Sequence, residues 1–157
     1  MKEIKLSRGE ITMVDDDDFE WLTQWKWYCD NKGYATRVVR VNGKDGRIFM
    51  ARQIMNAPKG MEVDHIDHNP LNNQKENLRI CTTAQNQWNR GRVYGSSKFL
   101  GVSTTGSSGV TYYKVDICSN GVKYYLGRYK DEEEAARVYD KKALELHGEF
   151  ARLNFNL

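Results

Sequence analysis

The sequence predicts an α+β fold built in two parts, and three features of the 157-residue chain support this prediction. The first part alternates short β-rich runs with Gly and Asn turn signals. A strongly polar stretch, Val63–Asn73, follows these runs. The end of the chain has the pattern of three strands followed by one amphipathic helix. We therefore expect a first domain at residues 1–92, a linker at 93–98 and a second domain at 99–157.

Composition excludes several classes of protein. Lys and Arg number 24 against 21 Asp and Glu, so the net charge of +3 does not by itself indicate a nucleic-acid partner. The three cysteines are far apart and form no Cys-x-x-Cys pair, which argues against a disulfide scaffold or a zinc ribbon. No run approaches the roughly 20 apolar residues of a membrane helix, and no signal pattern begins the chain. We expect a cytoplasmic protein that does not contact membranes.

The N-terminal segment predicts β-structure followed by a short helix. Residues 2–14 alternate polar and apolar side chains, which indicates two strands about a turn at Arg8–Glu10. The acidic run Asp15–Asp18 is typical of a solvated turn and helix start, and a metal site is the less favoured alternative. The aromatic residues of Phe19–Trp27 are expected to form core rather than a base-stacking platform.

A hairpin follows, with strands in Tyr28–Arg40 and Arg47–Ala51. The segment Val41–Gly46 between them contains Asn-Gly and Asp-Gly turn signals. The hairpin carries Arg37, Arg40, Lys44 and Arg47. These side chains either contact phosphates or occupy the solvent face, and the sequence leaves both alternatives open. Ala51–Asn56 is expected to be a short helix that ends before Pro58.

The polar stretch lies between two expected strands, Met61–Asp64 and Leu78–Cys81, and a helix at Ala84–Asn89 follows. Hydrolysis of a phosphodiester needs a base for water, a cation for the phosphate charge and a stabilised leaving oxygen. A well-held histidine base contributes about 10²–10⁴-fold to the rate. Adjacent strand residues such as Asp64 and His65 point to opposite faces, so the loop and helix must complete such a site.

The run Asp-His-Ile-Asp-His-Asn-Pro-Leu-Asn-Asn-Gln-Lys-Glu-Asn-Leu-Arg, which begins at Asp64, resembles the HNH motif of phage-type homing endonucleases. The resemblance implies a ββα-metal fold with His65 as general base. It implies that Asn77 holds the loop and orients the His65 ring. It also implies that Asp64 and Asn86 bind one divalent ion, Mg²⁺ or Mn²⁺.

The same resemblance implies strand nicking of double-stranded DNA by a monomer, which would leave 5′-phosphate and 3′-hydroxyl ends. The family often has Gly at the position of His68, which could contact phosphate or serve as an ordinary loop residue. Asn69, Asn72 and Asn73 are interpreted as loop-shaping residues. Arg79 could contact phosphate or pack on the strand surface. Zinc binding by His65 and His68 is less favoured, since no further His or Cys is near.

The last part of the chain resembles the plant-type APETALA2 DNA-binding domain. The resemblance is carried by Gly101-Val102, Tyr125-Leu126-Gly127-Arg128-Tyr129, Glu133 to Asp140 and Asn154-Phe155. It implies a three-stranded sheet in the major groove with one helix, Asp131–His147, behind it. The residues expected to contact DNA are Ser103, Lys114, Asp116, Lys123, Tyr125 and Arg128. Plant members use several Arg and Trp residues for base contacts, and this chain has Leu100, Ser103, Thr105 and Cys118 at matching positions. Arginine-to-guanine contacts should therefore be fewer.

Taken together, these patterns predict a metal-dependent, homing-type DNA endonuclease that is targeted by a C-terminal DNA-binding domain. The alternative from another class is a non-catalytic, sequence-specific DNA-binding regulator, against which the intact set of four catalytic positions argues. A weaker alternative is RNA binding through exposed tyrosines. For the lysines and arginine of the C-terminal sheet, an ordinary solvated surface is the alternative to DNA contact.

Overall fold

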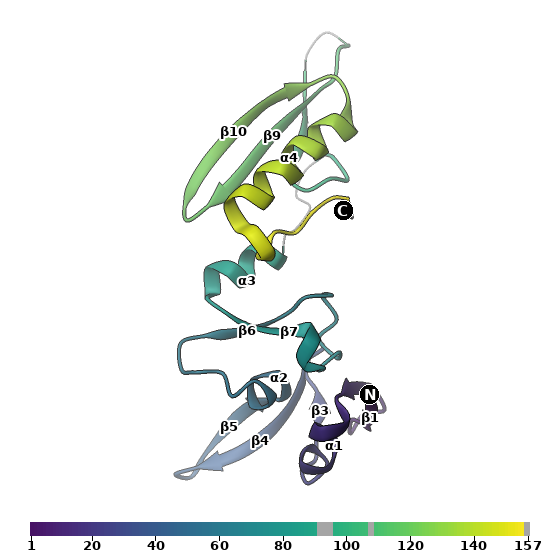
Figure 1. The fold of residues 1–157 in the computed structure, drawn as a ribbon, viewed down its shortest axis with the longest axis vertical. Coiled ribbons are helices and arrows are strands. Elements are labelled where there is room, and N and C mark those ends of the chain that lie inside the picture. The colour runs from purple at the N-terminus through teal and green to yellow at the C-terminus, as the bar shows by residue number, and fades with distance from the viewer. Residues whose placement is uncertain (91–95, 107–108, 156–157) are drawn as a thin grey trace. The chain divides into compact units, whose positions relative to one another are not determined.

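The computed structural model describes residues 1–90, 96–106 and 109–155. The chain divides into two compact units, Met1–Thr83 and Ala84–Leu157, and each is described by itself. Both units combine small sheets with few helices, in agreement with an α+β class (Figure 1). Part of the predicted linker, residues 93–95, lies outside the described residues, and the predicted domain boundaries remain predictions.

The first unit contains three small antiparallel sheets. Its elements are β1 (Lys2–Lys5), β2 (Ile11–Val14), α1 (Asp16–Leu22), β3 (Tyr28–Cys29), β4 (Ala35–Val41), β5 (Lys44–Phe49), α2 (Met50–Ile54), β6 (Glu62–His65), the 3₁₀ turn η1 (Lys75–Asn77) and β7 (Leu78–Cys81). The strands pair as β1–β2, β3–β4–β5 and β6–β7. The last pair frames the polar stretch, as the sequence predicted.

Aromatic residues build the core of the first unit. Trp27 is almost fully buried, and its indole Nε1 donates to the Leu22 carbonyl at 2.8 Å. Trp25 makes edge-to-face contacts with both Trp21 and Trp27, at centroid distances of 5.9 and 6.4 Å. The Arg37 guanidinium lies 4.4 Å from the centre of the Trp25 ring. The predicted core role of these aromatic residues is therefore confirmed, and Arg37 packs against that core.

The β4–β5 hairpin turns at Asn42 and Gly43, whose φ angles of 51° and 75° satisfy a type I′ turn. The expected break over Val41–Gly46 was too long, because Lys44 already begins β5. The second turn signal, Asp45-Gly46, is overridden: these residues pair with β4 in the ladder. Because β4 and β5 pair up to the two-residue turn, they form one long ribbon (Figure 1).

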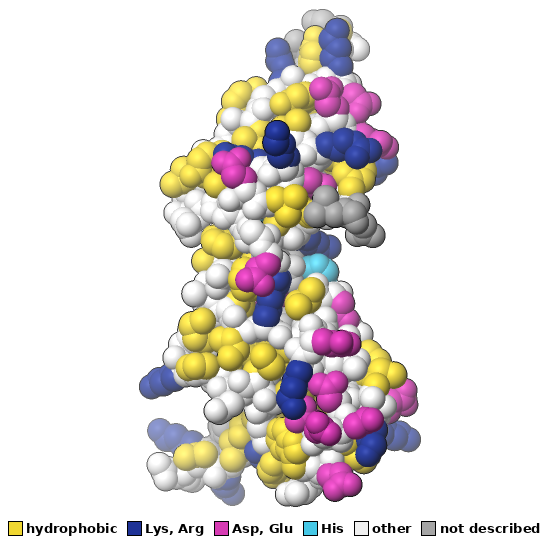
Figure 2. Space-filling view, in the orientation of Figure 1, with side chains coloured by type: hydrophobic (Ala, Val, Ile, Leu, Met, Phe, Trp, Pro, Cys, Tyr) yellow, Lys and Arg dark blue, Asp and Glu magenta, His cyan; other side chains and the backbone are white. Residues whose placement is uncertain are grey.

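The acidic run at the start of α1 connects this helix to the η1 turn. The Asp15 carboxylate accepts a hydrogen bond from the Lys75 backbone N–H at 2.9 Å. The buried Asp18 pairs with the Lys75 ammonium at 2.9 Å and accepts from the Trp21 indole. Acidic side chains accordingly gather over the part of the surface that carries α1 (Figure 2). These contacts hold η1, which ends at Asn77.

The second unit is a three-stranded antiparallel sheet in the order β10–β9–β8, with one long helix packed on it (Figure 1). Its described elements are the greater part of α3 (Thr83–Arg90), β8 (Val102–Thr105), β9 (Tyr112–Ser119), β10 (Val122–Tyr129), α4 (Glu132–His147) and the 3₁₀ turn η2 (Gly148–Phe150). Val102, Val115, Ala135 and Ala136 form its core. The Asp131 side chain caps α4 by accepting from the Glu134 N–H at 2.7 Å. The predicted sheet and helix are thus confirmed.

No helix among the described residues is long and apolar enough to cross a membrane.

Candidate active site

The β6–β7 pair sets the frame of the site. Asp64 pairs with Arg79 and His65 with Leu78 in the antiparallel ladder. Beyond this pair, the Ile66 N–H donates to the Asn77 carbonyl at 2.9 Å. The ladder therefore places Asp64 and His65 at the end of β6, directly before the polar loop. Consecutive strand positions send these two side chains in different directions, as expected from the sequence.

The His65 imidazole is buried, with 6% of the residue exposed. Its Nε2 lies 3.2 Å from the Asn73 Oδ1. Burial is the largest influence on the pKa of His65 and lowers it, although the Asn73 hydrogen bond and the Asp67 and Asp64 charges oppose this shift. The ring is consequently neutral near pH 7, which is the state that a general base requires.

Asn73 is a site residue that the sequence interpretation missed. It was interpreted as loop-shaping, yet its amide contacts the His65 ring and is 1% exposed. The other end of the amide donates to the Thr12 hydroxyl at 2.8 Å. Thr12 is fully buried on β2 and far from Asn73 in sequence, so no local pattern could have indicated this contact.

Asn77 holds the loop that follows His65. Its Oδ1 accepts from the Asp67 N–H at 3.0 Å, and its Nδ2 donates to the Asp67 carboxylate at 2.9 Å and to the Asn72 carbonyl at 2.8 Å. These contacts agree with the loop-holding part of its predicted role. Among the described residues, it is Asn73 rather than Asn77 that bonds the Nε2 of His65.

Asp67 is the centre of the loop. One carboxylate oxygen accepts from the Asn69 N–H at 2.8 Å and from Asn77, and the other accepts from the Asn72 amide at 2.8 Å. Burial would raise the pKa of Asp67, but the hydrogen bonds from Asn72, Asn69 and Asn77 outweigh it, so the pKa lies below its ordinary value. Asp67 is therefore ionised at neutral pH and fixes the loop electrostatically.

His68 occupies a left-handed backbone position, with φ of 63°. Gly reaches this region without a Cβ penalty, which gives a physical reason for Gly at this position in related motifs.

The turn that contains Gly33 packs against the loop. Gly33 has φ of 91°, and a Cβ added there would lie 3.2 Å from the Pro70 ring. The loop and the turn that contains Gly33 are therefore closely packed.

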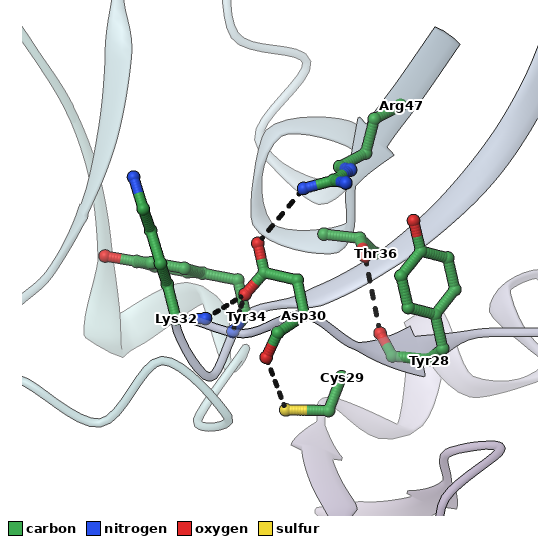
Figure 3. A network of polar contacts seen from close by, with 7 residues as sticks. All are labelled: Tyr28, Cys29, Asp30, Lys32, Tyr34, Thr36 and Arg47. Carbon is green, nitrogen blue, oxygen red and sulfur yellow. Dashed lines mark hydrogen bonds and ion pairs between the residues drawn. The ribbon is translucent and has the colours of Figure 1, made fainter. Parts of the chain in front are cut away.

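That turn is organised by Asp30 (Figure 3). Its Oδ1 accepts from the backbone N–H groups of Lys32 and Tyr34 at 2.9 and 3.0 Å. Its other oxygen lies 3.5 Å from the Arg47 guanidinium. The fixed turn places the Tyr34 ring against the His65 ring, with centroids 5.8 Å apart. The Asp30 network thus forms part of the wall around His65, which the sequence did not indicate.

The Asp64 carboxylate is 4% exposed and is held by Arg79 from the facing strand. The Arg79 Nε and Nη2 atoms lie 2.8 and 2.7 Å from the Asp64 Oδ2. The sequence left two roles open for Arg79, phosphate contact or strand-surface packing. The structure shows a different one, because Arg79 orients the Asp64 carboxylate.

The described residues contain no cluster of three or more His, Cys, Asp and Glu side chains suited to a metal. The predicted ligands, however, are one carboxylate and one amide. Asp64 belongs to the first unit, and Asn86 lies half-buried on α3 in the second. Hard divalent ions favour such oxygen donors, so the chemistry of Asp64 and Asn86 fits the expected ion.

The six residues predicted to contact DNA share one face of the second unit's sheet. They are Ser103, Lys114, Asp116, Lys123, Tyr125 and Arg128. Ser103, Lys114 and Arg128 form one row across the three strands. The ladder shifts by one residue between Tyr125 and Gly127, and this bulge returns Arg128 to the same face. The opposite face carries the buried Val115 and Ile117, and Val115 packs against Ala135 and Ala136 of α4.

Charges on this face are partly paired. The Asp116 carboxylate lies 2.9 Å from the Lys114 ammonium and 3.3 Å from that of Lys123. Burial raises the pKa of Asp116, but the two lysines outweigh it, and the net pKa is lowered. Tyr125 is 62% exposed. With Arg128, the face carries three cationic side chains and one anionic side chain among the six.

Comparison with known proteins matches part of the chain to a family model and most of it to a viral relative. The family model described as HNH endonuclease matches residues 56–88, which include Asp64, His65, Asn77 and Asn86. An uncharacterised HNH endonuclease of Acanthamoeba polyphaga mimivirus is 33% identical over 153 residues, covering 94% of this chain and 76% of that protein. Protein 3.8 of Escherichia phage T7 is 34% identical over 100 residues, covering 60% of this chain and 77% of that protein.

A third relative is an ethylene-responsive transcription factor of Medicago truncatula, which is 42% identical over 60 residues. This match covers 38% of the chain and 25% of the plant protein. No solved structure matches the chain significantly. The long viral match and the family model, together with the buried histidine at the end of β6, show that the chain belongs to the HNH endonucleases and is a nuclease.

Proposed function

We propose that the protein is a metal-dependent endonuclease of the homing type that nicks double-stranded DNA as a monomer. The observation that carries the proposal is the His65 ring, which is buried and held at the end of β6 inside the segment that matches the family model. The lowered pKa of His65 keeps the ring neutral and able to accept a proton.

In the proposed reaction, His65 takes a proton from the attacking water. The resulting hydroxide attacks phosphorus in line with the 3′ oxygen, the bond from phosphorus to that oxygen breaks, and the leaving oxygen takes a proton from solvent. The products carry 5′-phosphate and 3′-hydroxyl ends. Asn77 contributes by fixing the loop through Asp67 and Asn72. Arg79 contributes by orienting the Asp64 carboxylate.

A divalent ion, Mg²⁺ or Mn²⁺, held by oxygen atoms of Asp64 and Asn86 would neutralise charge on the phosphate and on the leaving oxygen. Asp64 suits this role because its carboxylate is already oriented by Arg79 and because it lies next to the base on β6.

The second unit is proposed to be an APETALA2-type domain that places the nuclease on its target. Its support is the three-stranded sheet with α4 behind it, the shared face of the six polar residues and the partial match to a plant transcription factor. Lys114, Lys123 and Arg128 are suited to phosphates, which position a protein without reading sequence. The exposed Tyr125 adds apolar contact area on the same face.

Incubation of the protein with Mg²⁺ and a supercoiled plasmid that carries its host locus tests the nuclease proposal. We expect nicked circles from the wild type, and a rate about 10²–10⁴-fold lower from His65→Ala. Lys141→Ala is the control, because it removes an exposed side chain of α4 that has no proposed role, and it should retain most activity. Equal rates for His65→Ala and the wild type would overturn the assignment of the base, and a linear primary product would overturn nicking.

A further inference from the structure

We propose that Thr12 and Asn73 form a hydrogen-bonded relay that fixes the tautomer of His65, so that Nε2 carries the proton and Nδ1 is the basic nitrogen. The catalytic importance of the relay rests on the proposed nuclease function. The relay itself is a property of the folded chain and can be tested without cleavage. It makes Thr12, on the N-terminal hairpin, a positioning residue for a base in the polar stretch.

The contact between Thr12 and Leu71 decides which group donates and which accepts in each hydrogen bond of the relay. The Thr12 hydroxyl lies 2.8 Å from the Leu71 carbonyl, and a carbonyl oxygen can accept but never donate. The single hydroxyl proton of Thr12 is therefore used on Leu71. Toward Asn73 the Thr12 oxygen is left with lone pairs, so it must accept.

This requirement fixes which end of the Asn73 amide faces which neighbour. The NH₂ group donates to Thr12 at 2.8 Å, and a weaker contact at 3.5 Å reaches the Pro70 carbonyl, which is also an acceptor. The Oδ1 atom must then face His65, where it lies 3.2 Å from Nε2. An amide oxygen accepts only, so Nε2 must bear the hydrogen, and in a neutral ring Nδ1 keeps its lone pair.

The relay is held rigidly. Thr12 and Asn73 are 0% and 1% exposed, so water does not compete for their hydrogen bonds. Two backbone hydrogen bonds of Met13, the residue after Thr12, join β2 to the loop. The Met13 N–H donates to the Leu71 carbonyl, and the Met13 carbonyl accepts from the Asn73 N–H, both at 2.8 Å. The Asn73 amide thus cannot turn over without breaking bonds to both strand and ring.

One consequence extends beyond the segment that matches the family model. That segment covers residues 56–88, yet the orientation of its histidine depends on Thr12. The β1–β2 hairpin is therefore proposed to be part of the catalytic apparatus, since it supplies the acceptor that sets the amide. A wrong tautomer would direct an N–H instead of a lone pair at the attacking water, and in a serine protease such an error costs about 10⁴-fold.

The test compares Thr12→Val with Thr12→Ser. Valine has the shape of threonine but cannot accept, so the Asn73 amide loses the partner that fixes it, whereas serine keeps the hydroxyl. Long-range ¹H–¹⁵N spectra of the full chain at pH 8, assigned with His65→Ala, report which ring nitrogen of His65 carries the proton. We expect Nε2–H in the wild type and Thr12→Ser, and a mixture that includes Nδ1–H in Thr12→Val.

Asn73→Asp separates the relay from a general loss of packing. A carboxylate still accepts from Nε2 but can no longer donate to Thr12, so this variant should keep the Nε2–H tautomer despite its broken contact. Far-ultraviolet circular dichroism checks that each variant is folded. Unchanged Nε2–H in a folded Thr12→Val protein, or Nδ1–H in Asn73→Asp, would overturn the relay.

Single-turnover cleavage then links the relay to function. Thr12→Val should cleave roughly 10–100-fold more slowly, the usual cost of removing an outer partner of a functional histidine, and Thr12→Ser should restore the rate. A shifted tautomer in Thr12→Val with no cleavage by the wild type would support the relay and refute the nuclease proposal. A shifted tautomer with an unchanged cleavage rate would overturn its role in positioning the base.

Discussion

Replacing Asn77 with alanine should loosen the loop after His65, because three hydrogen bonds end on this one side chain. The amide accepts from the Asp67 N–H and donates to the Asp67 carboxylate and the Asn72 carbonyl. Asn77 is 7% exposed, so water can replace these partners only if the loop opens. The change should therefore affect both the stability of the first unit and the position of the base.

The size of the effect follows from the contacts. Each hydrogen bond contributes a net of about 1 kcal/mol, so losing three should destabilise the first unit by about 3 kcal/mol. At a typical urea dependence of about 1–3 kcal/mol per molar, the unfolding midpoint should fall by roughly 1–3 M. Since small domains are stable by only about 5–15 kcal/mol, this is a large fraction of the total.

Urea titration monitored by tryptophan fluorescence provides the assay, because Trp21, Trp25 and Trp27 all belong to the first unit. Asn31→Ala is the matched control, because it removes an exposed asparagine from a turn, and it should change stability by less than about 0.5 kcal/mol. An Asn77→Ala midpoint equal to that of the control would refute the view that this side chain holds the loop.

Three further predictions concern the chemistry and the DNA contacts. Because burial lowers the pKa of His65, kcat/KM should be maintained at neutral pH and lost as pH falls through a midpoint below about 6.5, and a midpoint above that value would contradict the assignment. Asp64→Asn should raise the Mg²⁺ concentration for half-maximal cleavage by at least about tenfold, since losing even an outer partner of a metal ligand costs about 10–100-fold; an unchanged metal titration would exclude Asp64 as a ligand. Lys123→Ala should reduce the slope of the logarithm of the DNA-binding constant against the logarithm of the salt concentration by about 1. Lys141→Ala, on the exposed surface of α4, should leave this slope unchanged, and equal slopes for both variants would show that Lys123 does not contact DNA.

Features with local signals were predictable from the sequence. The α4 helix has an acidic first turn, a capping Asp131 and a terminal Gly148, and its observed span of Glu132–His147 follows them closely. The β6–β7 pair was also anticipated, since apolar runs flank the polar loop on both sides. The types and spacing of the polar residues in that loop resemble the HNH motif, and the HNH family model matches this segment.

Features that depend on contacts across the chain were not predictable. The bond from Asn73 to Thr12 joins residues 61 positions apart, and nothing near either residue distinguishes it from an ordinary loop or strand residue. The pairing of Arg79 with Asp64 required the register of the ladder, which the loop and η1 together set. The Asn42-Gly43 turn competed with a second turn signal three residues along the hairpin, Asp45-Gly46, and strand pairing decided between them.

The bulge in β10 is another feature that the sequence did not predict. Strict alternation from Tyr125 would place Gly127, rather than Arg128, on the outer face. Gly127 instead adopts φ of 121°, and the register shifts by one residue there. Arg128 had been expected at the DNA-contacting face from the resemblance alone, and the bulge supplies the physical reason for its position.

The single-turnover rate of cleavage by wild type and His65→Ala, measured with enzyme in excess over one DNA duplex in Mg²⁺, tests the central claim most directly. It reports the chemical step without product release. We predict that His65→Ala binds the duplex as tightly as the wild type and cleaves it about 10²–10⁴-fold more slowly. Equal single-turnover rates for the two proteins would contradict the assignment of His65 as the base.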